Sequence, residues 1–314
     1  MAWLTDKERS QRELSEMLRM RIQKPEILKI PGAHDAMAGL VAKETGFEVL
    51  YLSGGAYTAS RGLPDIGLIT VSEIAERARD IIRATNLPLL VDIDTGYGGV
   101  LNAVRTAKEM VEARVAGVQI EDQDLPKKCG HLNGKNIIPA EEMAAKIRAM
   151  RETVPTLTII ARTDAYAQEG VSGTVERALQ YREAGADGIF PEGLDSAESF
   201  QRVAEKVPGP LLANMTEFGR TPYFSADQFE QWGYRMVLFP VSSLRVAAKA
   251  YANLYRILLE EGTQISVLSA MQTRQELYDL IHYWDYEALD AHIARTILPT
   301  SHESTHQQEH DEDA

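Results

Sequence analysis

Short apolar runs recur along the chain and alternate with longer segments in which apolar residues repeat every three or four positions. The eight runs lie at 27–30, 49–52, 89–93, 118–120, 157–161, 188–190, 211–213 and 236–239. Their length and their β-branched residues predict buried strands. Glycines at Gly46, Gly117, Gly185 and Gly233 precede four of the runs. A glycine in this place predicts the left-handed end of the preceding helix.

Helical patterns separate most of these runs. They lie at Val71–Thr85, Val100–Arg114, Ala140–Glu152, Thr174–Glu183, Ser196–Glu205 and Ser225–Gln231. A further helix is predicted at Thr5–Met20, with Thr5 or Asp6 as its N-cap. Strands that alternate with helices indicate a parallel sheet, and eight such units predict an α/β fold of the (β/α)8 TIM barrel type. The alternative is an open doubly wound sheet, but Pro31-Gly32-Ala33-His34 lacks its glycine-rich phosphate turn.

The chain continues beyond the eighth run for longer than one barrel helix requires. Helical patterns follow at Leu244–Glu260, Val267–Tyr283 and Tyr286–Ile297, and aromatic residues among them predict packing on the barrel or on a second subunit. Residues 300–314 are almost entirely acidic or polar, which predicts disorder. We therefore expect one barrel domain with a C-terminal helical extension at 1–299, and a disordered acidic, histidine-containing tail at 300–314.

Composition narrows the class of protein. The chain has 314 residues, of which 44% are hydrophobic, and a net charge of -13, which disfavours binding to nucleic acid or to anionic membranes. A single cysteine excludes an internal disulfide framework and is typical of a reducing compartment. Residues 1–20 are charged throughout and lack the apolar core of a signal peptide, and no apolar run approaches a membrane span. We expect a cytoplasmic protein.

Acidic residues stand where the third and fourth runs end. Asp92 lies near the end of the third run, Asp94 follows that run directly, and Glu121 follows the fourth. The active site of a (β/α)8 barrel lies at these ends of the strands, and residues i and i+2 point to the same side of a strand. Carboxylates gathered in this way predict Mg²⁺, with Mn²⁺ possible. Alternatively, the acids form a structural network with Arg162 or Lys128.

Other strand ends carry groups suited to anions. The second run leads into Ser53-Gly54-Gly55, whose backbone amides can hold a carboxylate. Arg162 follows the fifth run, Glu192 follows the sixth, and Arg245 follows the eighth. A cation, two guanidinium groups and an amide cluster together predict a substrate with several carboxylates.

The only cysteine stands in Lys127-Lys128-Cys129-Gly130-His131. Glycines at 130 and 134 predict a loop, and the neighbouring cations favour ionisation of the thiol, which indicates a working cysteine. Cysteine is also often buried as a small hydrophobe, but these flanking residues are unsuited to a core.

Four segments together resemble the isocitrate lyase/phosphoenolpyruvate mutase superfamily, and the resemblance extends over nearly the whole chain. They are Tyr51-Leu52-Ser53-Gly54-Gly55, Asp92-Ile93-Asp94-Thr95-Gly96-Tyr97-Gly98, Lys127-Lys128-Cys129-Gly130-His131 and Ala161-Arg162-Thr163-Asp164-Ala165. The cysteine segment is specific to the lyases of this superfamily. The resemblance implies a Mg²⁺-dependent barrel in a homotetramer with swapped helices. It also implies cleavage of the tricarboxylate 2-methylisocitrate to pyruvate and succinate, in the 2-methylcitrate cycle of propionate catabolism.

The resemblance also implies residue roles. Asp92 and Asp94 would serve the metal, with Glu121 acting through water. The catalytic set would be Cys129, Tyr51, His131 and Arg162. Tyr51 is the candidate base, because a nearby cation lowers the pKa of a phenol. Cys129 would be the acid that protonates the carbanion, with His131 and Lys128 tuning the thiol. The substrate would contact Ser53, Gly54, Gly55, Asp65, Cys129, Gly130, Arg162, Glu192, Asn214, Met215, Thr216, Arg245 and Arg274.

Three alternatives stay open at the level of the sequence. Isocitrate lyases share the cysteine segment, but they are longer and carry tryptophan where this chain has Gly55. A 2,3-dimethylmalate lyase activity would need little change, because one methyl group is worth only about 1–3 kcal/mol of selectivity. A dicarboxylate-sensing barrel without catalysis is disfavoured, since binding alone needs no thiol.

Overall fold

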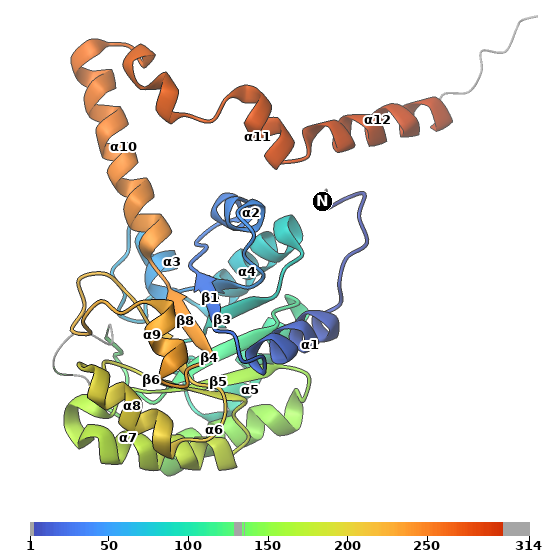
Figure 1. Cartoon of the computed structure of the whole chain (residues 1–314). Coiled ribbons are helices and arrows are strands. Elements are labelled where there is room, and N and C mark those ends of the chain that lie inside the picture. Colours follow the sequence, from blue (N-terminus) through green and yellow to red (C-terminus); the bar gives the residue numbers. More distant parts are fainter. Residues whose placement is uncertain (1–2, 129–133, 135, 298–314) are drawn as a thin grey trace, which may run out of the picture.

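Eight parallel strands form a barrel in the computed structural model, which describes residues 3–128, 134 and 136–297 (Figure 1). They are β1 (Leu28–Pro31), β2 (Leu50–Leu52), β3 (Leu89–Asp92), β4 (Gly117–Glu121), β5 (Thr158–Thr163), β6 (Gly188–Pro191), β7 (Leu212–Asn214) and β8 (Met236–Phe239). They pair in the orders β1-β8-β7 and β2-β3-β4-β5-β6. Parallel bridges between Gly32 and Tyr51 and between Ile189 and Leu211 join the two sheets. The predicted barrel is confirmed.

Helices lie outside the strands, as the alternating pattern predicted (Figure 1). They are α2 (Ala36–Glu44), α4 (Val71–Thr85), α5 (Val100–Glu112), α6 (Ala140–Thr153), α7 (Tyr166–Glu183), α8 (Ala197–Lys206), α9 (Ala226–Gln231) and α10 (Ser242–Glu261). A short helix that was not predicted, α3 (Gly54–Ser60), begins directly after β2 and is capped by Ser53. Helix α7 begins earlier than expected and is broken at Gly170, whose φ is 64°.

The N-terminal helix begins later than the pattern suggested. Helix α1 (Gln11–Ile22) follows Ser10, not Thr5 or Asp6. The reason is a capping box, in which Ser10 accepts a hydrogen bond from the Glu13 amide and the Glu13 carboxylate accepts one from the Ser10 amide. The apolar face of α1 is buried through Leu14 and Leu18.

Gly117 has a different role from the other glycines before strands. Gly46, Gly185 and Gly233 have positive φ as predicted, but at the end of α5 the left-handed residue is Arg114, with φ 65°. Gly117 instead begins β4, where an added Cβ would lie 2.8 Å from Leu18 Cδ2 of α1. The prediction was wrong there, because close packing of α1 on the strands requires the glycine.

The C-terminal helices form an arm that leaves the barrel along α10 (Figure 1). The predicted helix 267–283 is wrong, since the chain forms a 3-10 helix η1 (Ile265–Ala270) and then α11 (Arg274–Leu280) and α12 (Tyr283–Ile297). Thr273 and Glu276 form a capping box that starts α11. The tail predicted to be disordered lies outside the described residues. None of the helices in the described ranges has the length and apolarity to cross a bilayer.

Candidate active site

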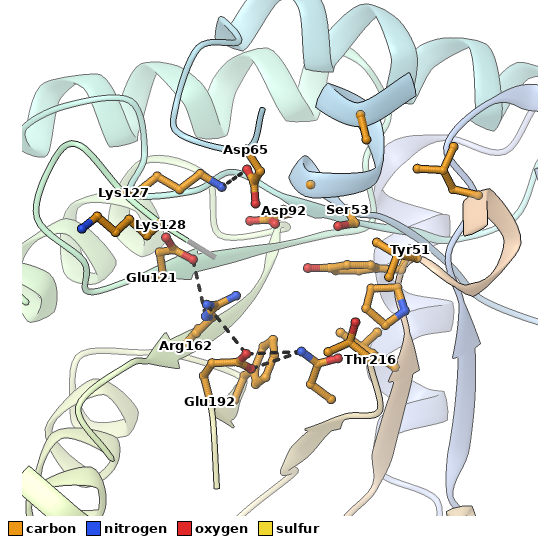
Figure 2. Close-up of a pocket in the computed structure, with 18 of the residues that line it drawn as sticks. Tyr51, Ser53, Asp65, Asp92, Glu121, Lys127, Lys128, Arg162, Glu192 and Thr216 are labelled. Atoms are coloured by element: carbon orange, nitrogen blue, oxygen red, sulfur yellow. Dashed lines mark hydrogen bonds and ion pairs between the residues drawn. The ribbon is translucent and has the colours of Figure 1, made fainter. Parts of the chain in front are cut away.

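A cavity of about 390 Å³ opens at the carboxyl ends of the strands, where the barrel predicted it (Figure 2). The polar residues that line it are Tyr51, Ser53, Asp65, Asp92, Glu121, Lys127, Lys128, Arg162, Glu192, Asn214, Thr216 and Arg245. Gly55, Ala59, Phe190, Leu238, Pro240, Val241, Leu244 and Ala248 complete the wall. Folding thus brings most of the predicted site residues to one place.

The two aspartates at the end of β3 lie against the start of α3. Asp92 Oδ2 accepts a hydrogen bond from the Gly54 amide at 3.2 Å, and Asp92 Oδ1 accepts one from the Asp94 amide at 3.1 Å. A Cβ at Gly54 would lie 3.1 Å from Asp94 Oδ1 and 3.2 Å from Asp92 Oδ2. Gly54 therefore lets the helix approach the acids, and one of the predicted anion-binding amides already serves Asp92.

The acidic cluster of Asp92, Asp94 and Glu121 is buried and lacks full charge compensation. Burial raises the pKa of Asp92 and raises the pKa of Glu121 well above its usual range. Burial and the neighbouring charge of Asp92 raise the pKa of Asp94 to about 7. A bound cation would favour the ionised form of all three carboxylates.

Lys127 contacts the acidic cluster, and the sequence patterns gave it no role there. Its ammonium lies 2.7 Å from Asp94 Oδ1 and also donates to Asp65 Oδ1 (Figure 2). Burial alone lowers the pKa of Lys127, but Asp94, Glu121 and the other carboxylates outweigh burial and raise it. In the sequence, the only indication of a role for Lys127 was its place close to Cys129. It supplies one positive charge to a cluster of several acids.

The acids do not form a complete protein ligand set. Within the described ranges, no group of three His, Cys, Asp or Glu side chains is arranged as ligands of one metal ion. Glu121 Oε1 is buried without a hydrogen-bond partner among these residues. Mg²⁺ usually keeps several waters and takes one or two carboxylates directly, so the donor set fits this ion with water completing its coordination.

Arg162 lies between Glu121 and Glu192 at the mouth of the barrel and pairs with both (Figure 2). Its guanidinium lies 3.4 Å from Glu121 Oε2 and 4.0 Å from Glu192 Oε1, and it donates two hydrogen bonds to Asp164 at 2.9 and 3.0 Å. The Asn214 amide donates to both oxygens of Glu192, at 3.3 and 3.4 Å. Arg162 therefore forms part of the network that the alternative interpretation expected, while it also faces the cavity.

Tyr51 faces the cavity from β2 but is not an activated phenol in these surroundings. Its hydroxyl donates to Gln119 Oε1 at 2.6 Å. Burial, followed by the charge of Asp92, raises its pKa well above the ordinary value. The sequence interpretation expected a cation to lower this pKa, and the protein groups alone shift it in the opposite direction.

Several predicted residues lie elsewhere. Asp94 touches Lys127 but does not line the cavity. Met215 is buried, and its sulfur accepts a hydrogen bond from the Phe224 amide, so its side chain belongs to the core. Arg274 is exposed at the start of α11 and does not line the cavity of its own chain, because the arm leads it away. Cys129, Gly130 and His131 lie outside the described residues.

Lys128, the last described residue before this segment, lines the cavity. Gln123 holds its backbone through two hydrogen bonds of 2.9 Å, and its ammonium donates to the Gly134 carbonyl at 3.0 Å. The chain therefore enters the cysteine segment at the rim of the cavity. Lys127, and not Lys128, pairs with the acids.

The apolar side of the cavity was not predicted as part of the site. Leu238 belongs to β8, and Pro240 and Leu244 follow that strand. Phe190 of β6 stacks on Arg162, with 5.2 Å between the guanidinium carbon and the ring centroid. A place near a strand end indicates that a residue lies close to the mouth of the barrel. In the sequence, however, an apolar side chain that lines the cavity cannot be distinguished from one that packs in the core.

A barrel whose mouth combines acids, arginines and an apolar wall defines an enzyme of the (β/α)8 class that acts on small anions. The family described as phosphoenolpyruvate phosphomutase matches residues 18–259. The chain belongs to the phosphoenolpyruvate mutase/isocitrate lyase superfamily. The superfamily expected from the sequence motifs is thereby confirmed.

Individual relatives are similar over almost the full length. A 2-methylisocitrate lyase of Bacillus subtilis (strain 168) is 60% identical over 299 residues, which are 95% of this chain and 99% of the relative. A 2-methylisocitrate lyase of Halalkalibacterium halodurans is 61% identical over 298 residues, covering 95% and 99%. A crystal structure of 2,3-dimethylmalate lyase is 33% identical, covers 89% of this chain and 95% of its own, and superimposes with a TM-score of 0.83.

Proposed function

We propose that this chain is a carbon–carbon lyase that cleaves 2-methylisocitrate into pyruvate and succinate. The observation that carries the proposal is the 60% identity, over 95% of the chain, to a 2-methylisocitrate lyase. The cavity is consistent with it, because buried acids, Arg162 and Arg245 stand around one space large enough for a small tricarboxylate.

Asp92 and Asp94 are proposed to hold a divalent cation, Mg²⁺ in preference to Mn²⁺, with Glu121 acting through water. Support comes from the buried, poorly compensated carboxylates and from the unpartnered Glu121 Oε1. When bound, the cation would stabilise negative charge on the substrate oxygen at C2. Lys127 would remain as the protein's own counter-charge to Asp65 and Asp94.

The substrate carboxylates are proposed to contact the guanidinium groups and the start of α3. Arg162 lines the cavity from β5, and Arg245 lines it from the start of α10, which follows β8. Ser53 and Gly55 line it beside them, and Asn214, Thr216 and Glu192 supply further polar contacts. Two separated cationic groups fix the orientation of a substrate with several carboxylates, so its reacting bond can be placed reproducibly.

Proton transfers are assigned to Tyr51 and Cys129. Tyr51 faces the cavity and is proposed, as the phenolate, to take the proton of the 2-hydroxyl. Its ionisation would require the positive charge of the cation, because burial and the charge of Asp92 raise the phenol pKa. Cleavage of the carbon–carbon bond then leaves a carbanion beside a carboxylate of the nascent succinate. The Cys129 thiol is proposed to protonate it, with His131 and Lys128 tuning the thiol.

Isocitrate is the principal competing substrate. Gly55 has no side chain, and a Cβ there would lie 3.1 Å from Asp65 Oδ2. The tryptophan that isocitrate lyases carry at this position would therefore displace Asp65. The absence of a side chain at Gly55, which leaves Asp65 in place, and the apolar wall of Leu238 and Leu244 favour a substrate with an additional methyl group.

The arm is proposed to pack on neighbouring copies in a homotetramer with swapped helices. Val246, Tyr255 and Leu259 of α10 are 70%, 65% and 87% exposed in the single chain, and Trp284 of α12 is 49% exposed. Apolar residues in such number on one arm are typical of a buried interface. We also propose that the protein acts in the cytoplasm, in propionate catabolism.

Steady-state kinetics with three substrates test the reaction. With Mg²⁺ present, we expect kcat/KM to be highest for 2-methylisocitrate, lower for 2,3-dimethylmalate and lower for isocitrate, with pyruvate and glyoxylate measured separately. Predominant release of glyoxylate from isocitrate would assign the chain to the other branch of lyases. Turnover of none of the three, with tight binding of dicarboxylates, would identify a sensor.

Metal removal tests the cation. We expect dialysis against EDTA to abolish turnover and added Mg²⁺ to restore it, because the acidic cluster alone provides no stabilisation for an alkoxide. Full activity in the presence of the chelator would contradict the assignment of Asp92 and Asp94.

A further inference from the structure

The turn after β3 has an unusual backbone. Asp94, Gly96, Tyr97 and Gly98 have φ of 49°, 85°, 58° and 140°. Glycine adopts such angles freely, but the left-handed region costs other residues about 1–2 kcal/mol each. Asp94 and Tyr97 therefore hold this conformation only because their surroundings impose it. The turn matters because its conformation decides where the Asp94 carboxylate points.

The turn is packed tightly against α5. A Cβ at Gly96 would lie 2.9 Å from Ala103 Cβ, and a Cβ at Gly98 would lie 2.7 Å from Asn102 Cγ. Packing from this side limits how far the turn can relax. This packing does not by itself orient the peptide groups of the turn. Their orientation is fixed by hydrogen-bond donors that reach the carbonyl oxygens.

Donors from three different elements reach three successive carbonyl oxygens of the turn. They are the Glu121 amide of β4 to Asp94 O at 2.9 Å, Lys146 Nζ of α6 to Thr95 O at 3.1 Å, and Thr106 Oγ1 of α5 to Gly96 O at 3.3 Å. Lys146 is the charged donor of this set, and the residue is 3% exposed. A hydrogen bond from a charged donor is stronger than one between neutral groups.

Lys146 has no part in the chemistry proposed above. It does not line the cavity, so it cannot touch the substrate. Burial of an ammonium group is unfavourable unless the group is well partnered. The partner here is the carbonyl of Thr95, the residue that follows Asp94, with the charges of Glu142 and Asp124 nearby. The position of this lysine is explained if its function is to hold the turn.

We propose that Lys146 is a positioning residue, whose hydrogen bond to Thr95 O fixes the left-handed turn and thereby aims the Asp94 carboxylate at the cation site beside Asp92. The inference rests on the proposed function in one respect, that Asp94 serves a divalent cation. It adds that the geometry of the site depends on a lysine of α6 that contacts neither the cation nor the substrate.

Lys146→Met removes the ammonium while keeping the length of the side chain. Groups that orient metal ligands typically change metal affinity by 10–100-fold when they are removed, so we expect Mn²⁺ to bind about tenfold more weakly or worse. Lys146→Arg keeps a charged donor, and we expect it to bind within about threefold of the parent protein. Lys108→Met is the matched control, because Lys108 is an exposed lysine on α5.

The measurement is a titration of metal-free full-length protein with Mn²⁺, in which electron paramagnetic resonance reports the free ion and no turnover is needed. Circular dichroism and thermal midpoints show whether each variant is folded. A folded Lys146→Met protein that binds Mn²⁺ within twofold of the parent would overturn the role of Lys146. If Lys146→Met does not fold, the Arg variant decides, since weak binding by a folded Lys146→Arg protein contradicts the proposal. Failure of the parent protein to bind Mn²⁺ removes the cation site itself, and the role of Lys146 with it.

Discussion

Arg162 carries a permanent positive charge into the wall of the cavity and is restrained on two sides. Asp164 accepts two hydrogen bonds from its guanidinium, and the Phe190 ring lies beneath it at 5.2 Å. A planar group with several donors can keep this pair and still face the substrate, which a single ammonium cannot. Its role depends on the shape of the group as well as on its charge.

Arg162→Lys therefore should not be a conservative change. Loss of charge-assisted hydrogen bonds at a buried site costs about 1.5–3 kcal/mol, which is roughly tenfold to a hundredfold in kcat/KM. We expect the loss mainly in KM for 2-methylisocitrate, with an unchanged circular dichroism spectrum. Arg202→Lys is the control, because Arg202 pairs with Glu198 at the surface of α8. Equal KM values for the two variants would exclude a substrate contact for Arg162.

Cys129 provides the second prediction at this scale. Serine is a far weaker acid than cysteine, so Cys129→Ser should nearly abolish turnover while assembly and Mg²⁺ binding survive. Steady-state turnover, light scattering and a metal titration check the three parts. Turnover near that of the parent protein would remove the general-acid role.

The helices of the barrel are held by contacts that the hydrophobic pattern does not specify. Phe200 of α8 packs its ring against those of Phe229, Trp232 and Tyr234, with centroid separations of 5.0, 6.0 and 5.4 Å. These rings come from α9 and from the segment that leads into β8. The cluster fixes two neighbouring helices and lies away from the cavity.

Truncation of Phe200 tests this cluster. Phe→Ala at a buried site costs about 3–5 kcal/mol, because the ring leaves a cavity among its neighbours. We expect Phe200→Ala to lower the urea midpoint strongly, whereas Leu101→Ala, at a side chain that is 84% exposed, should change stability by about 0.5 kcal/mol or less. Similar midpoints for the two variants would mean that the aromatic cluster contributes little.

At the scale of the whole molecule, the arm is the part that the barrel does not explain. Helix α10 leaves the strands with Ile257 as its buried residue in the described ranges, and several of its large apolar side chains, among them Val246, Tyr255 and Leu259, are exposed. The chain then turns back, and Trp3 donates its amide hydrogen to the Tyr286 hydroxyl at 3.1 Å. Large exposed apolar surfaces typically mark an interface, and in the proposed homotetramer a second copy would cover this face of the arm.

Leu259→Asp places a charge on the most exposed apolar residue of α10, which is 87% exposed in the single chain. If copies pack through the arm, the charge must be buried, and we expect the tetramer to dissociate into smaller species. Size-exclusion chromatography with light scattering measures the mass. Lys108→Glu, also at the surface, should leave the mass unchanged. A Leu259→Asp protein with the mass of the parent would contradict the arm as an interface.

Local patterns in the sequence determined the βα units, the barrel, and the strand ends that carry Asp92, Glu121, Arg162 and Glu192. This was possible because strand pairing repeats from unit to unit, and because all strands of a parallel barrel present their carboxyl ends on one face. The acids and arginines could therefore be placed together before any distance was known.

Tertiary structure alone decided how these groups meet. Lys127 lies between Asp65 and Asp94, which come from other loops, and Gly117 is required by Leu18 of a distant helix. Lys146 reaches the turn after β3 from α6, and Arg274 is carried away from its own cavity by the arm. Such contacts depend on the angles at which helices and loops pack on the barrel. Those angles are set by side chains far apart in sequence, so no local pattern encodes them.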